Sequence, residues 1–223
     1  MLAGCSVDDD PEPAPTRTGP VVTERPNQEP VTRSPEVAPT GPAIVAVPDL
    51  ISFQAPDGWF IALTGQLVKM APEHYPYEII ELAKASDMEP RVFAEEMNKG
   101  AYAIALGALH EGEHEGGHSH EIADNIHVAR NEPAGGLDGD WAREITDEMT
   151  MIGGSCTPVE KVSPAHLDEG RRFSCSADSG EGTIYTDAVL LPASGRLVSI
   201  MATTKEAETA AEIIDRVLET AKD

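Results

Sequence analysis

The stretch "GRRFSCSADSGEGTIYTDAVLLPASGRLVSIMATTKEAETAAEIIDRVLETAKD", residues 170–223, decides the fold class of this chain. It contains three strand-like runs, at 170–177, 183–191 and 196–202, which are separated by short turn signals rich in Gly, Ser, Asp and Pro. Strands joined by such short turns pair in an antiparallel meander. The stretch therefore predicts an antiparallel sheet, with the last turn expected at residues 192–195.

The end of the same stretch has the periodicity of an amphipathic helix. Apolar residues recur at a spacing of 3.6 residues and are expected to line its buried side: Ala210, Ile213, Ile214, Val217, Leu218 and Ala221. Thr203 and Glu206 are the pair expected to form a capping box at its start. The sheet should therefore be followed by one C-terminal helix.

The residues before this stretch predict further strands and one helix. The segment 51–65 carries two apolar runs on either side of the turn signal at 56–58, which predicts a hairpin. A helix is expected over 87–100, capped by Asp87 and with Val92, Phe93 and Met97 at helical spacing. Further strands are expected in the apolar runs 102–109 and 122–130.

A second helix is expected over 138–152. Trp141, Ile145, Met149 and Ile152 would share one face of it, and Gly153 would end it. An amphipathic helix must bury its apolar stripe, and a sheet offers the surface to do so. The fold class that follows is α+β, an antiparallel β-sheet with helices packed on it, spanning residues 46–223.

Residues 6–45 have a different composition from the rest of the chain. Ten of the 18 prolines lie between Pro11 and Pro48, and large apolar residues are almost absent before Ile44. Such a segment cannot bury enough apolar surface to offset the entropy lost on ordering. We expect it to be a disordered, Pro-rich linker that holds the domain on a flexible tether.

The net charge of −23 excludes one class of function. A phosphate backbone would be repelled, and no cluster of Lys or Arg reverses the charge locally, so we expect no binding to nucleic acid. The same charge opposes contact with anionic lipid head groups. Attachment to a membrane would therefore require a hydrophobic anchor.

The first five residues, "MLAGC", supply a candidate for that anchor. Leu2-Ala3-Gly4-Cys5 resembles the lipobox of bacterial lipoproteins, and the resemblance implies that a signal peptidase cleaves before Cys5 and that Cys5 is diacylated. The basic segment and the apolar run of a signal peptide are not part of the sequence before it. Two or more acyl chains, at about 0.8 kcal/mol per buried methylene, would hold the protein on the membrane.

The other two cysteines form an even pair once Cys5 is set aside. Cys156 and Cys175 lie in two strand-like runs, and the midpoint between them falls in the turn signal "SPAHLDE". In an antiparallel hairpin they would face each other, where a disulfide is possible in suitable pairs. We expect a disulfide outside the reducing cytosol, with two buried reduced thiols as the alternative.

The order of these elements resembles a known group of proteins. Pro56-Asp57-Gly58-Trp59 in an early hairpin, the strand "IADNIHVAR" after an inserted loop, and a strand meander closed by a C-terminal helix are similar to actinobacterial exported lipoproteins of the LpqN-type group. Their fold is the PsbP-like α/β/α sandwich, also found in the extrinsic subunit of photosystem II. The resemblance implies a non-catalytic binding or accessory module in the cell envelope and transfers no catalytic residue.

The segment 110–121, "HEGEHEGGHSHE", contains the spacing His-Glu-x-x-His twice. A zinc protease needs this motif on a helix, and the glycines at 112, 116 and 117 make a helix unfavourable. In a hairpin loop, the side chains that could instead bind Zn, Ni or Cu are the imidazoles of His110, His114, His118 and His120. A solvated acidic loop with incidental histidines is the alternative.

Three functions follow, in order of preference. The first is a lipid-anchored protein on the extracytoplasmic face of the cell membrane that binds an envelope protein or a lipid-like, apolar ligand. The second is a lipoprotein that binds a divalent metal through the His-rich loop. An enzyme is third, since the sequence has no nucleophile elbow and no phosphate loop.

Overall fold

The structure is a computed structural model of the whole chain, and it describes residues 43–107, 124–129, 136–139, 141–151, 153–178 and 182–223. All the described residues lie in one compact unit, which spans Val37–Asp223. Within them, no helix has the length and apolar character needed to cross a membrane.

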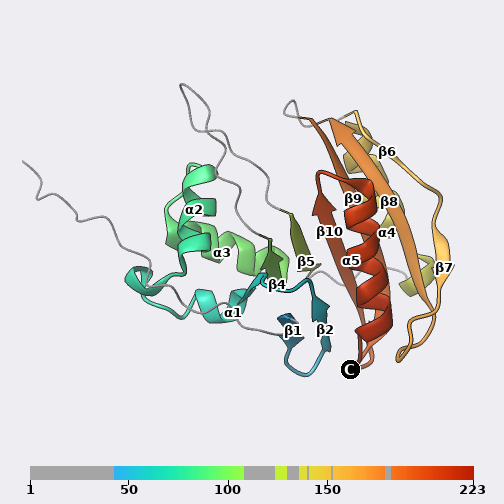
Figure 1. Cartoon of the computed structure of the whole chain (residues 1–223), viewed down its shortest axis with the longest axis horizontal. Helices are drawn as coiled ribbons and strands as arrows, with labels where there is room; N and C mark the ends of the chain where they lie inside the picture. The colour runs from blue at the N-terminus through green and yellow to red at the C-terminus, as the bar shows by residue number, and fades with distance from the viewer. Residues whose placement is uncertain (1–42, 108–123, 130–135, 140, 152, 179–181) are drawn as a thin grey trace, which may run out of the picture. The chain divides into compact units, whose positions relative to one another are not determined.

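The unit has the expected α+β class, with antiparallel sheets and helices packed against them (Figure 1). The main sheet has eight described strands in the order β3-β4-β5-β10-β9-β8-β6, and β7 also pairs with β8. Its strands are β3 (Phe60–Leu63), β4 (Ala101–Leu106), β5 (Asn125–Ala129), β6 (Ser155–Cys156), β7 (Glu160–Val162), β8 (Gly170–Asp178), β9 (Thr183–Ala193) and β10 (Arg196–Thr204). Strands β8, β9 and β10 form the meander that the sequence predicts.

Side chains of the main sheet alternate between two faces, and different elements cover each face. On the first face, Val189 and Leu191 of β9 pack in one core with helix α5 (Ala207–Thr220) and with a small second sheet of β1 (Ala43–Val47) and β2 (Ile51–Ala55). On the second face, Ala188 and Leu190 pack against helix α4 (Trp141–Met151). Figure 1 shows α5 and α4 on opposite sides of the sheet.

The β3–β4 side of the second face carries a separate group of short helices. These are α1 (Thr64–Leu67), the 3-10 turn η1 (Pro72–His74), α2 (Tyr77–Ala85) and α3 (Pro90–Gly100). Their buried residues Leu67, Ile79 and Ala94 form a core with Ile104 and Leu106 of β4. The sequence patterns predicted only α3 in this region, because α1 and α2 are short.

The start of α3 differs from the expectation. The helix begins at Pro90 with Glu89 as its N-cap, whereas Asp87 was expected to cap it. Asp87 instead ends α2 in a left-handed conformation, with φ at 52°. Proline suits the first helical position because its φ is already helical. The N–H that proline lacks would have no partner within the helix at that position.

The hairpin expected over 51–65 is wrong in its pairing, although its turn is present. Gly58 adopts φ 77°, and Trp59 N donates to Pro56 O at 3.4 Å. However, β2 pairs with β1, and β3 pairs with β4. The first strand starts at Ala43, before the expected domain start at residue 46. A turn signal marks a change of direction but does not specify the strand that pairs.

Two predictions about the C-terminal stretch also need correction. Thr203 stays in β10, and its hydroxyl contacts that of Thr186 at 3.1 Å. The hydroxyl that precedes α5 belongs to Thr204, which accepts from Glu206 N at 3.3 Å. The last turn of the meander contains only Ser194 and Gly195, at φ 49° and 74°, so the residues at 192 and 193 continue the strand β9.

Candidate functional site

The two site predictions with the sharpest chemistry fall outside the described residues. The lipidation site Cys5 lies in 1–42, and the proposed metal ligands His110, His114, His118 and His120 lie in 108–123. The ends of the latter segment are described: Gly107 N donates to Asp124 O at 2.8 Å, so its two ends are adjacent. Within the described part of the chain, no group of His, Cys, Asp and Glu could hold a metal ion.

Cys156 and Cys175 form a disulfide. They face each other in the antiparallel pairing of β6 with β8, and their Cα atoms are 4.0 Å apart. The next pair along the ladder is hydrogen-bonded, since Thr157 N donates to Ser174 O at 2.8 Å, so the cysteines occupy the closer, non-hydrogen-bonded kind of pair. The reduced alternative does not apply to this structure, and the sulfur atoms are not available as nucleophiles.

The disulfide lies in the small core that holds α4 on the second face of the sheet. Cys175 packs there with Phe173 and Trp141, whose rings meet edge to face with centroids 4.9 Å apart. Gly154, between α4 and β6, has no room for a side chain, because a Cβ would lie 2.7 Å from Ser176 O. The position of α4 is therefore tightly specified on this part of the sheet.

Between α4 and α3, the second face is only partly covered. α3 packs on β4 and α4 packs on β8, whereas β5 contacts mainly its neighbours β4 and β10. The side chains that β5 and β10 direct to this face form what we term the central strip: Asn125, His127, Ala129, Leu197, Ser199, Met201 and Thr203. All of them except Ser199 are half-buried.

The strands on either side of the central strip are covered by helices, whereas the strip itself is only partly covered. His127 pairs with Ile104 of β4 on one side and with Met201 of β10 on the other. Ile104 is 8% exposed, and Ala188, which pairs with Met201, is fully buried. Solvent therefore reaches the middle strands of a sheet whose flanking strands are covered by helices.

The central strip has no charged side chain among its described residues. Burial lowers the pKa of His127, so its imidazole is neutral at neutral pH and can both donate and accept a hydrogen bond. The Ser199 hydroxyl is buried and has no hydrogen-bond partner in the described part of the chain. The arrangement can therefore bind an apolar body and offer it a few neutral hydrogen-bonding groups.

The opposite face has a buried ion pair that sequence reasoning missed. Arg172 Nη2 donates to Asp187 Oδ2 at 2.6 Å and Nε donates to Oδ1 at 3.1 Å, while Nη1 donates to Asp215 of α5 at 2.6 Å. Burial raises the pKa of the Asp187 carboxyl, and the hydrogen bonds from Arg172 oppose that rise. These contacts join β8, β9 and α5, so the ion pair has a structural role.

No family model matches this chain, and no curated protein matches it significantly in sequence.

Proposed function

We propose that this chain is a lipid-anchored, non-catalytic binding protein of the bacterial cell envelope, and that it binds an apolar envelope molecule on the central strip. The observation that carries the proposal is a half-buried, uncharged surface in the middle of the sheet of a strongly acidic protein. The lipobox-like "MLAGC" at Cys5 and the resemblance of the element order to LpqN-type lipoproteins support the location. The disulfide supports it as well, since disulfides persist in oxidising compartments.

The chemistry of the central strip specifies the ligand further. Burying an ionised group without a partner is costly, and the described residues of the strip provide no countercharge. The half-buried, neutral imidazole of His127 can satisfy one polar group of a ligand. The expected ligand is an uncharged amphiphile with an apolar chain and a small hydroxyl- or carbonyl-bearing head.

The test compares two amphiphiles of equal chain length, a monoacylglycerol and its fatty acid, below their micelle concentrations at pH 7.5. Each competes with the neutral fluorophore N-phenyl-1-naphthylamine on the full chain. The monoacylglycerol should displace the dye, and the fatty acid should do so at least about tenfold more weakly, because its carboxylate must be desolvated. Equal displacement by both, or displacement by neither, would contradict the proposal.

Two variants test whether the ligand binds on the central strip. Met201→Glu introduces a charge into the central strip and should abolish displacement by the monoacylglycerol. Met151→Glu makes the same change at a methionine of α4 that is 80% exposed and should leave displacement unchanged. If both variants bind as the wild type does, the ligand occupies another part of the chain.

The anchor is tested separately in cells. The full chain with its native upstream region should partition with the membrane fraction, and Cys5→Ser should release it, because the acyl chains would be absent. Mass spectrometry of the mature N-terminus should find diacylated Cys5. An intact N-terminal Met1 on a protein of the soluble cell fraction would reject the envelope location.

Metal binding is the second candidate function. The observation that favours it is the antiparallel pairing of β4 with β5 up to Gly107 and Asp124, which brings together the two ends of the segment that contains the histidines. Calorimetric titration with Zn²⁺, Ni²⁺ and Cu²⁺ should give a dissociation constant below millimolar. The triple substitution of His114, His118 and His120 by Ala should remove it, and an unchanged titration would reject this function.

A further inference from the structure

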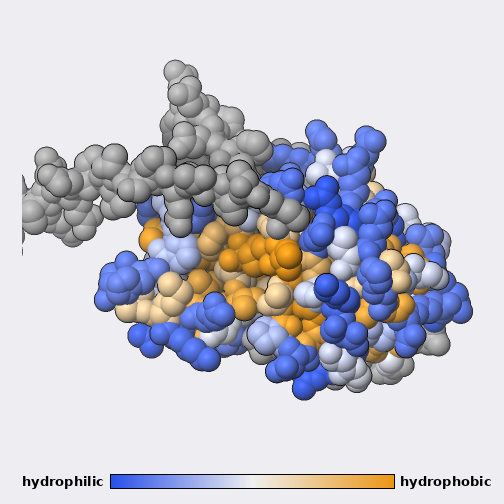
Figure 2. Space-filling model, turned by 60° about the horizontal axis from the view of Figure 1, so that its bottom comes forward, coloured by the Kyte–Doolittle hydropathy of each residue, from blue (hydrophilic) through white to orange (hydrophobic). Residues whose placement is uncertain are grey.

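Exposed large apolar side chains gather on the helical group α1–α3. Of the seven that the described residues contain, four lie between residues 70 and 92: Met70, Tyr77, Met88 and Val92, which are 37%, 53%, 42% and 45% exposed. Figure 2 shows apolar residues among hydrophilic ones over the left part of the unit, where Figure 1 places these helices. We term these four residues the helical patch.

The helical patch is not needed for the core beneath it. The inner sides of these helices already bury Ile79, Ala83 and Ala94, whose side chains are fully shielded from solvent. Patch residues point away from that core and remain exposed at more than a third of their surface. Four exposed large apolar side chains within 23 residues of a small domain mark a candidate interaction site.

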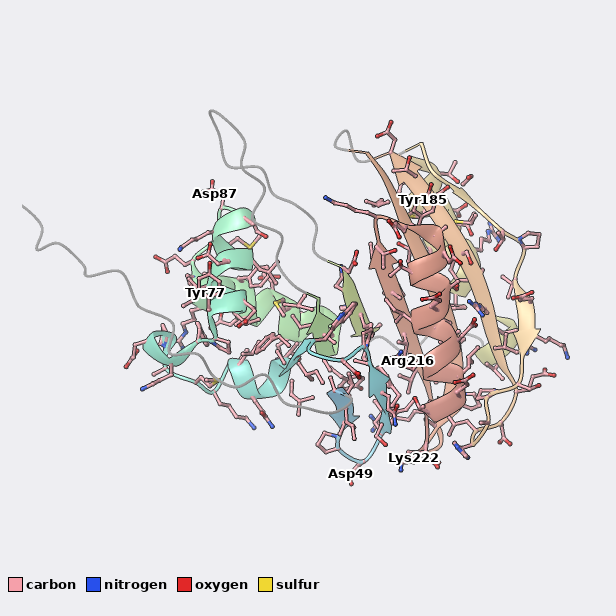
Figure 3. The ribbon with its side chains drawn as sticks, in the orientation of Figure 1. Asp49, Tyr77, Asp87, Tyr185, Arg216 and Lys222 are labelled. Atoms are coloured by element: carbon pink, nitrogen blue, oxygen red, sulfur yellow. A yellow bond between two sulfur atoms is a disulfide. The ribbon has the colours of Figure 1, made fainter. Side chains whose placement is uncertain are left out.

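The backbone holds part of the helical patch in a defined position. α2 ends in a Schellman motif, in which Met88 N donates to Ala83 O at 2.9 Å and Asp87 N donates to Lys84 O at 3.0 Å. Val92 lies in the first turn of α3, which starts two residues earlier at Pro90. Tyr77 and Asp87 mark the two ends of α2 in Figure 3. A partner would therefore meet preset anchors, which lowers the entropy cost of binding.

The charge around the helical patch is acidic. Three cations of these helices are already paired with Glu81, Glu95 and Glu96 at 2.6, 3.2 and 2.6 Å. Glu73, Asp87 and Glu89 are exposed and form no ion pair with the described residues. In this segment of the described chain, Lys69 alone is a cation without such a pair. The net charge left for a partner is negative.

We infer that the helical patch is a docking surface for a protein segment that carries Lys or Arg around apolar anchors. The apolar side chains supply contact area, with Tyr77 as an aromatic anchor and two methionines that adapt to the partner's shape. The exposed carboxylates favour a basic partner and repel anionic lipid. This surface is separate from the central strip and does not depend on the proposed ligand there.

The test uses two synthetic probes, a fluorescein-labelled 18-residue amphipathic peptide of leucine and lysine and its leucine–glutamate counterpart. Fluorescence anisotropy with the full chain at physiological salt should show binding of the lysine peptide alone. The double variant Tyr77→Ala/Met88→Ala should bind it at least tenfold more weakly. The control Met151→Ala/Val159→Ala removes apolar side chains that are 80% and 46% exposed elsewhere and should bind within twofold of wild type.

Each other outcome overturns the inference. Equal affinity of the two double variants, with circular dichroism showing both folded, would reduce the binding to general charge attraction. Binding of the glutamate peptide, or no binding of the lysine peptide below 1 mM, would rule out a basic segment as the partner. Binding to phosphatidylglycerol vesicles that depends on Tyr77 and Met88 would reassign the patch to a membrane surface. None of these results bears on dye displacement at the central strip.

Discussion

Arg172 is the residue that ties the first face of the sheet to its covering helix. Its side chain is 14% exposed and that of its main partner Asp187 is 3% exposed, whereas that of Asp215 is 60% exposed. A buried ion pair contributes little net stability over apolar residues, but removing one partner leaves an uncompensated buried charge. The cost of a change at this site therefore depends on which partner is removed.

Arg172→Met should lower the free energy of unfolding by about 3–5 kcal/mol, because Asp187 would stay buried without a partner. The double variant Arg172→Met/Asp187→Leu should recover most of that loss, since no charge remains to be desolvated. Asp215→Asn should cost at most about 1 kcal/mol, because that carboxylate is exposed. Urea unfolding measures all three, and a double variant no more stable than the single one would contradict this account.

His127 should make stability depend on pH in a defined direction. Burial between Ile104 and Met201 lowers its pKa below the 6.5 of the unfolded chain. Below pH 6.5 the unfolded state therefore binds more protons than the folded state, and the free energy of unfolding falls as the pH falls. Above pH 6.5 this contribution is absent.

The measurement is urea unfolding of the wild type and of His127→Asn at pH 7.5 and pH 5.5. The wild type should lose more stability than the variant between these values, because asparagine does not titrate. An NMR titration should give the His127 imidazole a pKa below 6.5. Parallel losses in the two proteins would contradict the prediction.

At the scale of elements, the end of α2 shows how a local signal can be assigned to the wrong helix. Asp87 was expected to open α3, and it closes α2 in the left-handed region at φ 52°. Asp is a good N-cap, but its short polar side chain also tolerates this conformation. Asp87 is free to end α2 because Pro90 starts α3 without it.

Asp87→Gly should raise the free energy of unfolding by about 1 kcal/mol, because glycine adopts the left-handed conformation without steric cost. Ser86→Gly is the matched control, since Ser86 has φ −90° and gains nothing from glycine. We expect the control to be destabilised by about 0.5–1 kcal/mol through the entropy of the unfolded chain. A thermal melt that ranks the two variants in the opposite order would show that Asp87 is not strained.

At the scale of the whole unit, the C-terminus holds the β1–β2 sheet in place. Ser52 N donates to Lys222 O at 2.8 Å, and Lys222 N donates back to Ser52 O at 2.9 Å. Gln54 N donates to Thr220 Oγ1 at 3.0 Å, and Ala221 is fully buried beside them. Figure 3 shows Asp49, in the β1–β2 turn, and Lys222 at the same end of the unit.

Deletion of residues 221–223 should expose the Ser52 amide, and its hydrogen exchange should become at least about tenfold faster. Amides of β8, which pairs with β9 from Arg171 to Asp178, should be unaffected. Lys222→Ala keeps both backbone hydrogen bonds and should leave the exchange of Ser52 as it is in the wild type. Equal acceleration in both variants would assign the effect to the Lys222 side chain.

The sequence by itself determined the features whose signal is local. The meander, the C-terminal helix with its buried stripe at Ala210, Ile213 and Val217, and the facing of Cys156 and Cys175 follow from periodicity and from turns between neighbouring segments. Such patterns are set within a few residues of each other. They can be recognised without knowledge of the remaining fold.

Only the tertiary structure decided which distant segments meet. β2 pairs with β1, β5 lies beside β10, and Arg172 reaches Asp187 and Asp215 because packing brings far-apart residues together. The central strip arises in the same way, since it is the part of the sheet that α3 and α4 leave half-covered. No residue pattern along the chain encodes that gap, because exposure depends on where the covering helices end in space.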